Sequence, residues 1–192
     1  KPDYVQARSN LLLTEQYRPG HNAQTLYELH REWDERHGRE FRAAWSEYRN
    51  IPEPDRRLRI GFVSPDLRRH PVGYFIVGLF ENLSKNEIET VCYSDHIDDD
   101  LTGRIKAATD VWRNVRGTSD ENLIKTILDD EIDILFDLTG HSANNRLLVF
   151  ARKPAPLQVT WAGYVGTTGL SAIDYLVSDI YSTREHEEAY YS

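Results

Sequence analysis

Short apolar runs alternate with longer amphipathic segments from residue 58 onward, and this alternation constrains the fold more than any other feature of the chain. The apolar runs predict strands at 58–63, 89–93, 111–115, 132–138, 157–161 and 173–177. The segments between them predict helices at 72–83, 101–108, 120–129 and 144–151. Strands separated by helices form right-handed βαβ units and pair in parallel. The sequence therefore predicts an α/β domain over residues 56–192, built on a Rossmann-like parallel sheet.

The first 50 residues predict a separate helical segment. Asn22 can cap a helix there, and Gly38 can end it. Aromatic side chains between residues 41 and 48 are expected to pack onto the following domain rather than to bind a cofactor. The prolines within residues 51–55 break helices and strands alike, so the domain boundary is expected at that point.

Composition argues against several classes of partner. The formal net charge of −8 and the pI of about 5.4 disfavour a general nucleic-acid surface. Cys92 is the only cysteine, so the chain can form no internal disulfide. No apolar stretch is long enough to span a bilayer, and the first residues do not resemble a signal peptide. We therefore expect a cytoplasmic protein that binds neither membrane nor nucleic acid.

Both ends of the sequence suggest a longer natural protein. Methionine is absent even at position 1, and the chain stops at Ser192 without a turn or cap signal. We therefore expect the natural chain to continue.

A first polar loop, residues 64–73, follows the first predicted strand and precedes the first predicted helix, a usual corner for phosphates and cofactors. It lacks the G-x-G-x-x-G spacing of a dinucleotide site. It carries His70 beside Arg68 and Arg69. Nearby positive charge favours a neutral imidazole, which can accept a proton from a hydroxyl as a general base. The alternative is a histidine that hydrogen-bonds its own loop.

A second polar loop follows the most apolar predicted strand. His141 lies in it and is expected at the same edge of the sheet as His70. Asp137 either orients one of these histidines or hydrogen-bonds the loop. Ser142 or Asn144 is expected to cap the helix that follows.

A third loop, after the fifth predicted strand, has glycine at every third position from Gly163 to Gly169. Glycine allows a backbone to approach a ligand closely. Tyr164, Thr167 and Thr168 add hydroxyl groups, so the loop can cradle a sugar or a phosphate. The alternative is a tight turn that only leaves the sheet.

The three loops are expected on one rim, because the carboxyl ends of parallel strands meet at one edge of a sheet. We expect His70, His141 and the threonine-bearing loop to face a common hollow there.

Two other patterns suggest a metal site without establishing one. Asp98–Asp100 has the D-x-D spacing of metal-dependent sugar transferases, but no clear strand end precedes it, so a solvated loop is expected. His30 and His37 can share a helix face, but no third ligand is near them in the sequence. We expect no metal site.

Three blocks of the α/β domain resemble the catalytic region of O-GlcNAc transferases. They are residues 59–66 (RIGFVSPD) with His70–Pro71, residues 137–141 (DLTGH), and residues 152–164 (RKPAPLQVTWAGY) continued by residues 166–169 (GTTG). The blocks keep the order and approximate spacing of that family, and the resemblance covers about residues 58–192. Residues 1–50 resemble the helices that join a tetratricopeptide superhelix to the catalytic region in bacterial members.

The resemblance implies a GT-B fold, in which two Rossmann-like halves enclose the active site. This chain is then the N-terminal half, and the C-terminal half is absent. The implied reaction is inverting transfer of N-acetylglucosamine from UDP-GlcNAc to serine or threonine hydroxyls of proteins, without a metal or other cofactor. His70 matches the histidine proposed in the family as general base or orienting group.

The resemblance also places the donor sugar against the third loop. The substrate-binding residues that it implies are His141, Ala162, Gly163, Tyr164, Gly166, Thr167 and Thr168. Since the lysine and histidine that bind UDP belong to the C-terminal half, the fragment alone is expected to be inactive.

The sequence departs from the family pattern at two places. Val165 stands where many members have proline, and the segment after His70–Pro71 differs from animal members and resembles bacterial ones. A related branch, resembling the plant SPINDLY proteins, transfers fucose from GDP-fucose, so a protein O-fucosyltransferase is one alternative. A non-catalytic protein-binding module with structural rim histidines is the other.

Overall fold

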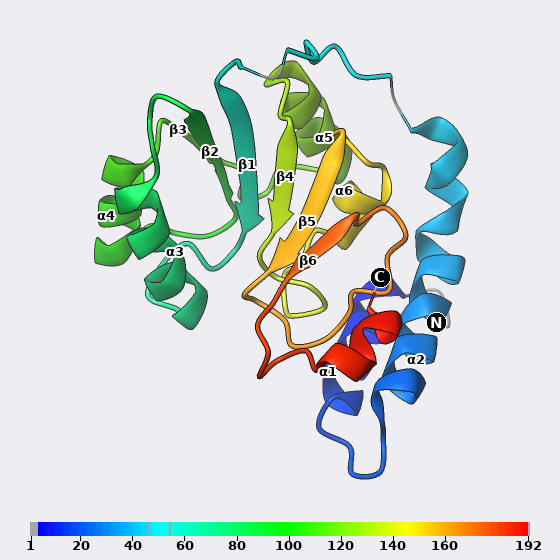
Figure 1. The fold of residues 1–192 in the computed structure, drawn as a ribbon. Helices are drawn as coiled ribbons and strands as arrows, with labels where there is room; N and C mark the ends of the chain where they lie inside the picture. The colour runs from blue at the N-terminus through cyan, green and yellow to red at the C-terminus, as the bar shows by residue number, and fades with distance from the viewer. Residues whose placement is uncertain (1–3, 46, 54, 192) are drawn as a thin grey trace.

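The α/β domain is built on a six-stranded parallel sheet with the strand order β3-β2-β1-β4-β5-β6 (Figure 1). The computed structural model describes residues 4–45, 47–53 and 55–191. The strands are β1 (Leu58–Ser64), β2 (Ile88–Ser94), β3 (Val111–Asn114), β4 (Ile134–Asp137), β5 (Leu157–Trp161) and β6 (Tyr175–Val177). Each neighbouring pair is parallel. The predicted α/β fold and each predicted strand are confirmed.

Helices cover both faces of the sheet. They are α1 (Val5–Glu15), α2 (Ala23–His37), α3 (Pro71–Asn82), α4 (Asp100–Ala108), α5 (Asp120–Asp129) and α6 (Leu147–Ala151), with 3-10 turns η1 (Arg39–Ala44) and η2 (Glu185–Tyr190). Helices α3 and α4 pack on one face, and α5 and α6 on the other (Figure 1). Within the described part of the chain, no helix combines the length and apolarity that crossing a bilayer requires.

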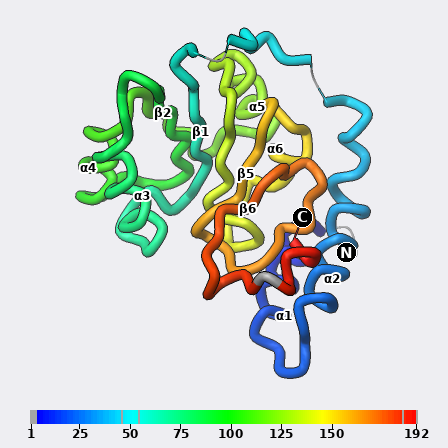
Figure 2. The backbone as a smooth tube through the Cα atoms, viewed as in Figure 1, coloured from blue at the N-terminus to red at the C-terminus, as the bar shows by residue number. Residues whose placement is uncertain are grey.

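The N-terminal helices share a core with the sheet. Leu12 of α1 and Trp33 of α2 are buried in the same apolar cluster as Leu135 of β4 and Phe150 of α6. Figure 2 shows that α1 and α2 also lie beside the C-terminal end of the chain, where Tyr27 and Tyr190 approach with ring centroids 6.2 Å apart. Burial of apolar surface therefore fixes the helical segment against the α/β domain.

The predicted start and end of α2 are confirmed. The side chain of Asn22 accepts a hydrogen bond from the Thr25 amide at 2.9 Å, and Gly38 follows the last residue of α2. Beyond α2 the chain forms a 3-10 turn and then an extended segment. There the Trp45 indole donates to the Ala151 carbonyl at 2.9 Å, and the Tyr48 hydroxyl to that of Lys153 at 3.0 Å. The predicted packing of these aromatics is confirmed.

Helix α6 is shorter than predicted, and its expected cap is wrong. The helix starts at Leu147 rather than near Asn144, and neither Ser142 nor Asn144 caps it. Asn144 instead has φ of 59°, a left-handed conformation that asparagine tolerates and that breaks a helix. The Asn145 side chain accepts from the Leu147 amide at 3.3 Å. The extra loop residues lengthen the rim at the carboxyl end of β4.

Residues 51–55, the connection where the domain boundary is predicted, form neither helix nor strand, apart from Pro54, which lies outside the described residues. The predicted features at residues 1–3 and at Ser192 also lie outside them. Asp133, just before β4, holds this connection against the amino edge of the sheet. Its carboxylate accepts two hydrogen bonds from the Arg56 guanidinium. It also accepts one from the Arg59 amide at 2.8 Å and one from the Asn50 side chain at 2.6 Å. Burial alone would raise the pKa of Asp133, but these donors hold it below its usual value.

We expect Asp133→Ala to reduce the free energy of unfolding by about 2 kcal/mol, because several donors lose a charged acceptor. Denaturant titration of the intact protein measures the change. Asp55→Ala is the matched control, since Asp55 is exposed on the same connection. An equal effect of the two substitutions would contradict this role for Asp133.

Candidate functional site

A hollow of about 400 Å³ lies at the carboxyl ends of β5 and β6. The loop after β5 contributes Ala162, Tyr164 and Gly166 to its lining, and α3 contributes Phe75. The strand order reverses between β1 and β4, and open α/β sheets bind ligands at the carboxyl edge where such a reversal occurs. The hollow shares that edge, so three of the predicted substrate-binding residues line a cavity in the expected place.

Another part of the lining comes from β6 and the segment after it, which carry no recognisable motif. Ser178, Asp179 and Ser182 follow β6 and close the hollow on that side. The Asp179 carboxylate accepts from the amides of Ser182 at 2.8 Å and Tyr181 at 2.9 Å. These hydrogen bonds lower its pKa, so the group is ionised near neutral pH.

Gly163 sets the position of the loop. A Cβ at this residue would collide with the carbonyl oxygen of Leu138, which lies just after β4. Ser142 in the same β4–α6 loop donates to the Gly163 carbonyl at 3.3 Å. The loops after β4 and β5 are therefore packed directly against each other, and the lack of a side chain at Gly163 serves this backbone contact.

The two threonines do not offer their hydroxyls to the hollow described above. The Thr167 hydroxyl accepts from the Gly169 amide at 3.0 Å, and the Thr168 hydroxyl from the Leu170 amide at 3.3 Å. Both side chains are buried. The predicted hydroxyl cradle is wrong here, because these oxygens stabilise the turn itself.

Tyr164 also directs its hydroxyl into the protein. The phenol oxygen lies 2.7 Å from Nε2 of His30 and 3.3 Å from the side-chain nitrogen of Gln16. The residue lines the hollow all the same. Its contribution to a ligand site is therefore the ring and the backbone rather than a free hydroxyl.

His141 is fully buried, so the expectation that it faces a hollow with His70 is wrong. Its Nε2 donates to the Thr168 carbonyl at 2.8 Å, and its Nδ1 lies 3.1 Å from the Ser9 hydroxyl. Burial, and then the neighbouring His30, lower its pKa to about 3. In this structure His141 is buried beneath the loop after β5 and holds it by the hydrogen bond to Thr168.

His70 occupies the same edge of the sheet and is half-exposed. It is the N-cap of α3, with Nδ1 accepting from the Val72 amide at 3.3 Å. Nδ1 also lies 3.9 Å from an Asp66 carboxylate oxygen. Phe75, farther along the same helix, lines the hollow, whereas His70 is not among the described residues that do. His70 thus hydrogen-bonds its own loop and still presents part of its ring to solvent.

Asp137 does not orient a histidine. It accepts from the Thr160 hydroxyl at 2.9 Å, the Gly140 amide at 2.9 Å and the Thr139 amide at 3.1 Å. Complete burial raises its pKa to about 6, although these hydrogen bonds oppose the change. Of the two roles predicted for Asp137, hydrogen bonding within the loop is the one observed.

The acidic run Asp98–Asp100 supports α4 and is only partly a loop. Asp99 caps the helix with Thr102, and Asp100 is its first residue. Asp98 pairs with Lys106, and Asp100 with Arg69. Among the residues that the structure describes, no group of three or more His, Cys, Asp or Glu side chains could hold a metal ion.

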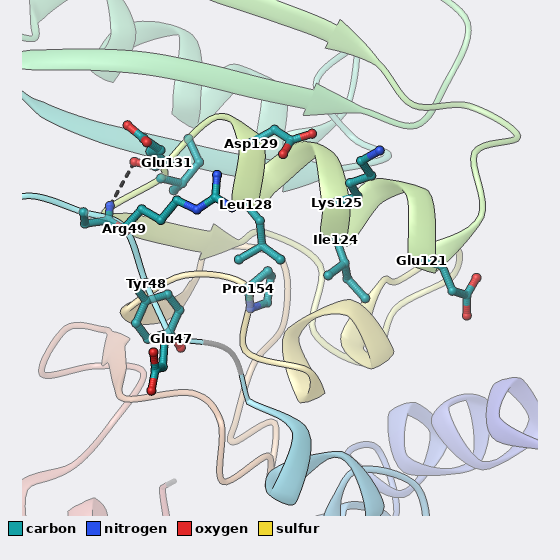
Figure 3. Close-up of a pocket in the computed structure, with 12 residues that line it drawn as sticks. Glu47, Tyr48, Arg49, Glu121, Ile124, Lys125, Leu128, Asp129, Glu131 and Pro154 are labelled. Atoms are coloured by element: carbon teal, nitrogen blue, oxygen red, sulfur yellow. Dashed lines mark hydrogen bonds between the residues drawn. The ribbon is translucent and has the colours of Figure 1, made fainter.

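A second hollow, of about 340 Å³, lies away from this edge between residues 47–50 and α5 (Figure 3). Ile124, Leu128 and Pro154 form an apolar part of its wall, and charged side chains of both signs surround them (Figure 3). The Asn50 side chain donates to the Glu131 carbonyl at 2.9 Å. None of the predicted site residues lies there.

Comparison with known proteins identifies relatives across the whole chain. A family model described as Glycosyl transferase family 41 matches residues 40–192. The chain is 37% identical over 186 residues to a probable UDP-N-acetylglucosamine–peptide N-acetylglucosaminyltransferase, SPINDLY, of Hordeum vulgare, covering 93% of this chain and 19% of that protein. A UDP-N-acetylglucosamine–peptide N-acetylglucosaminyltransferase of Caenorhabditis elegans is 31% identical over 126 residues, or 64% of this chain and 11% of that protein.

A solved structure agrees with these matches. A mutant O-GlcNAc transferase of Thermobaculum terrenum superposes with a TM-score of 0.93 at 38% identity, covering 100% of this chain and 37% of that one. The chain therefore spans about a fifth of the length of the SPINDLY relatives and little more than a third of the solved structure.

Proposed function

The chain belongs to glycosyl transferase family 41, and on this basis we propose that it forms the N-terminal half of the catalytic region of a protein O-glycosyltransferase. The reaction would move N-acetylglucosamine from UDP-GlcNAc to serine or threonine hydroxyls. The observation that carries the proposal is the TM-score of 0.93 at 38% identity to an O-GlcNAc transferase over the full chain. The remainder of the GT-B enzyme would supply the other wall of the active site.

The hollow beside the loop after β5 would receive the sugar. Backbone groups of Ala162 and Gly166 are suited to polar contacts, because neither residue has a bulky side chain that would keep a ligand away. The Tyr164 ring would form part of the wall. The acceptor oxygen would attack the anomeric carbon as the bond to the diphosphate breaks, which inverts that carbon.

His70 is the group we propose for handling the proton of the acceptor hydroxyl. Its half-exposed imidazole at the carboxyl edge can exchange protons with a substrate on that side. The diphosphate would leave without a metal, as expected from the family resemblance. Addition of EDTA to an active preparation tests that expectation directly.

The wider setting is also part of the proposal. Helices α1 and α2 would adjoin a tetratricopeptide region in a bacterial-type cytoplasmic protein. Its partners would be proteins with serine or threonine acceptors, the nucleotide sugar and the C-terminal catalytic half, without nucleic acid or membrane.

Donor choice and catalysis can be tested together in the intact protein. UDP-GlcNAc and GDP-fucose are compared by calorimetry, and acceptor proteins are analysed by mass spectrometry after incubation with each donor. We expect binding and N-acetylhexosamine transfer with UDP-GlcNAc. Transfer of fucose alone would overturn the donor assignment. Acceptor binding without either donor binding or transfer would favour a non-catalytic module.

A further inference from the structure

We propose that His30 of α2 is a positioning residue for the donor site, which holds Tyr164 and thereby the loop that lines the hollow. This inference rests on the proposed function for the hollow, and it adds a residue from the helical segment to that site. The residue lies more than a hundred positions away from the loop it would control.

The hydrogen-bonding roles of His30 follow from its backbone partner. Its Nδ1 lies 2.6 Å from the Leu26 carbonyl, which can only accept, so Nδ1 carries the proton. In the neutral ring Nε2 is then an acceptor, and the Tyr164 hydroxyl donates to it at 2.7 Å. The hydrogen bond within one turn of α2 therefore fixes the orientation of the His30 ring, and the ring in turn fixes the position of the Tyr164 hydroxyl.

The ring stays in this state at neutral pH. His30 is fully buried, and burial lowers its pKa to about 4. The groups that face it are the hydroxyl of Tyr164, the amide of Gln16 and the ring of His141, none of which carries a negative charge near neutral pH. Nothing in this cluster would draw a proton onto Nε2.

A second contact ties the other end of the loop to α1. His141 donates to the Thr168 carbonyl and lies against the Ser9 hydroxyl of α1. The rings of His30 and His141 meet with centroids 5.1 Å apart, and those of His141 and Tyr164 with centroids 5.5 Å apart. The loop is thus held at Tyr164 by His30 of α2 and at Thr168 by His141, which itself rests against Ser9 of α1.

The backbones leave little room for adjustment. Gly169 has φ of 69°, and a Cβ there would collide with the backbone of His30. The loop therefore abuts α2 itself as well as the His30 side chain. A displacement of α2 would have to move the loop with it, so the donor wall depends on where this helix lies.

The test uses four variants of the intact protein. His30→Leu removes the acceptor, His30→Gln can restore one at a similar place, and Tyr164→Phe removes only the donor oxygen. The double variant His30→Leu with Tyr164→Phe asks whether the two residues act through the same hydrogen bond. Tyr4→Phe is the control, because Tyr4 is 61% exposed.

We expect His30→Leu and Tyr164→Phe each to raise the KM for the nucleotide sugar about fivefold to tenfold with little change in kcat, as for one lost hydrogen bond. The double variant is expected to be no worse than either single variant. His30→Gln should restore KM to within about twofold, and Tyr4→Phe should leave it unchanged. A role in general stability alone would not produce this rescue or this separation of KM from kcat.

Hydrogen exchange without substrate gives an independent measurement. Amides between residues 162 and 169 should exchange faster in His30→Leu and in Tyr164→Phe than in the wild type or in His30→Gln. If His30→Leu does not fold, Tyr164→Phe carries the test alone. Unchanged KM and unchanged exchange in Tyr164→Phe would overturn the inference. A wild-type protein that neither binds nor transfers a sugar, but shows the exchange differences, would overturn the proposed function and leave the anchoring contact in place.

Discussion

Replacing His70 with asparagine in the intact protein is expected to lower kcat for glycosyl transfer about a hundredfold or more, without loss of the fold. Asparagine is a good N-cap and can keep the start of α3 in place. It cannot accept or relay a proton at neutral pH. The loss would therefore report the chemistry of the imidazole rather than the integrity of the helix.

The role of His70 as the N-cap of α3 has to be distinguished from its role in proton transfer, because its Nδ1 already accepts a hydrogen bond from the Val72 amide. A neutral ring in this arrangement carries its proton on Nε2, so its outer nitrogen donates a hydrogen bond. To act as a base through Nε2, the ring must place its proton on Nδ1 and direct it toward Asp66, whose carboxylate lies 3.9 Å away. Asp66→Asn should then lower kcat as well, whereas an orienting role through Nε2–H should tolerate that change.

Two further variants complete the comparison. His70→Ala removes both the cap and the imidazole, and Ser119→Ala removes only a cap, that of α5. Kinetics and thermal unfolding of each are measured side by side. Ser119→Ala should destabilise by about 1 kcal/mol and leave kcat unchanged. Activity of His70→Asn within a few-fold of the wild type would remove His70 from the mechanism.

The strands of the sheet could be predicted from the sequence because each depends on a pattern of neighbouring residues. Strands buried on both faces of a parallel sheet are short continuous apolar runs, and each is separated from the next by a turn or helix signal. β5 was predicted with its observed ends, and β1 within one residue. Helix α6 was misjudged because asparagine also suits the start of a helix as an N-cap, so Asn144 alone does not show that the backbone is left-handed there.

The candidate site could be predicted only in part, because the environment of several of its residues depends on segments far away in the sequence. Glycine spacing located the loop after β5, but Thr168 can direct its hydroxyl inward or outward without any change of sequence. His141 is buried by Ser9 and Trp33, which lie far earlier in the chain, so no local pattern could reveal its environment. Phe75 and Asp179 line the hollow from segments that carry no motif.

The buried histidines predict a measurable acid sensitivity. The pKa is about 4 for His30 and about 3 for His141, both lowered from 6.5 chiefly by burial. Between about pH 4 and 6 the unfolded chain therefore binds two more protons at these residues than the folded chain does. Asp137 opposes them, since burial raises its pKa to about 6 and the folded chain binds one more proton there. For these three groups the net difference is about one proton, so together they should make stability rise with pH by about 1.4 kcal/mol per pH unit between about pH 5 and 6. Below that range, carboxylates such as Asp133, whose pKa is held below its usual value, add to the slope.

His30→Gln isolates the contribution of one histidine to that slope. Removing its titration should bring the net proton difference of the remaining two groups near zero, so the free energy of unfolding should depend much less on pH between about pH 5 and 6. Denaturant titrations of the wild type and the variant across this range measure the change. His186→Gln is the control for the exchange of a histidine for glutamine, because His186 is exposed. Equal slopes for wild type and His30→Gln would mean that His30 is protonated in the folded protein, and the acceptor role that places Tyr164 would then be lost with it.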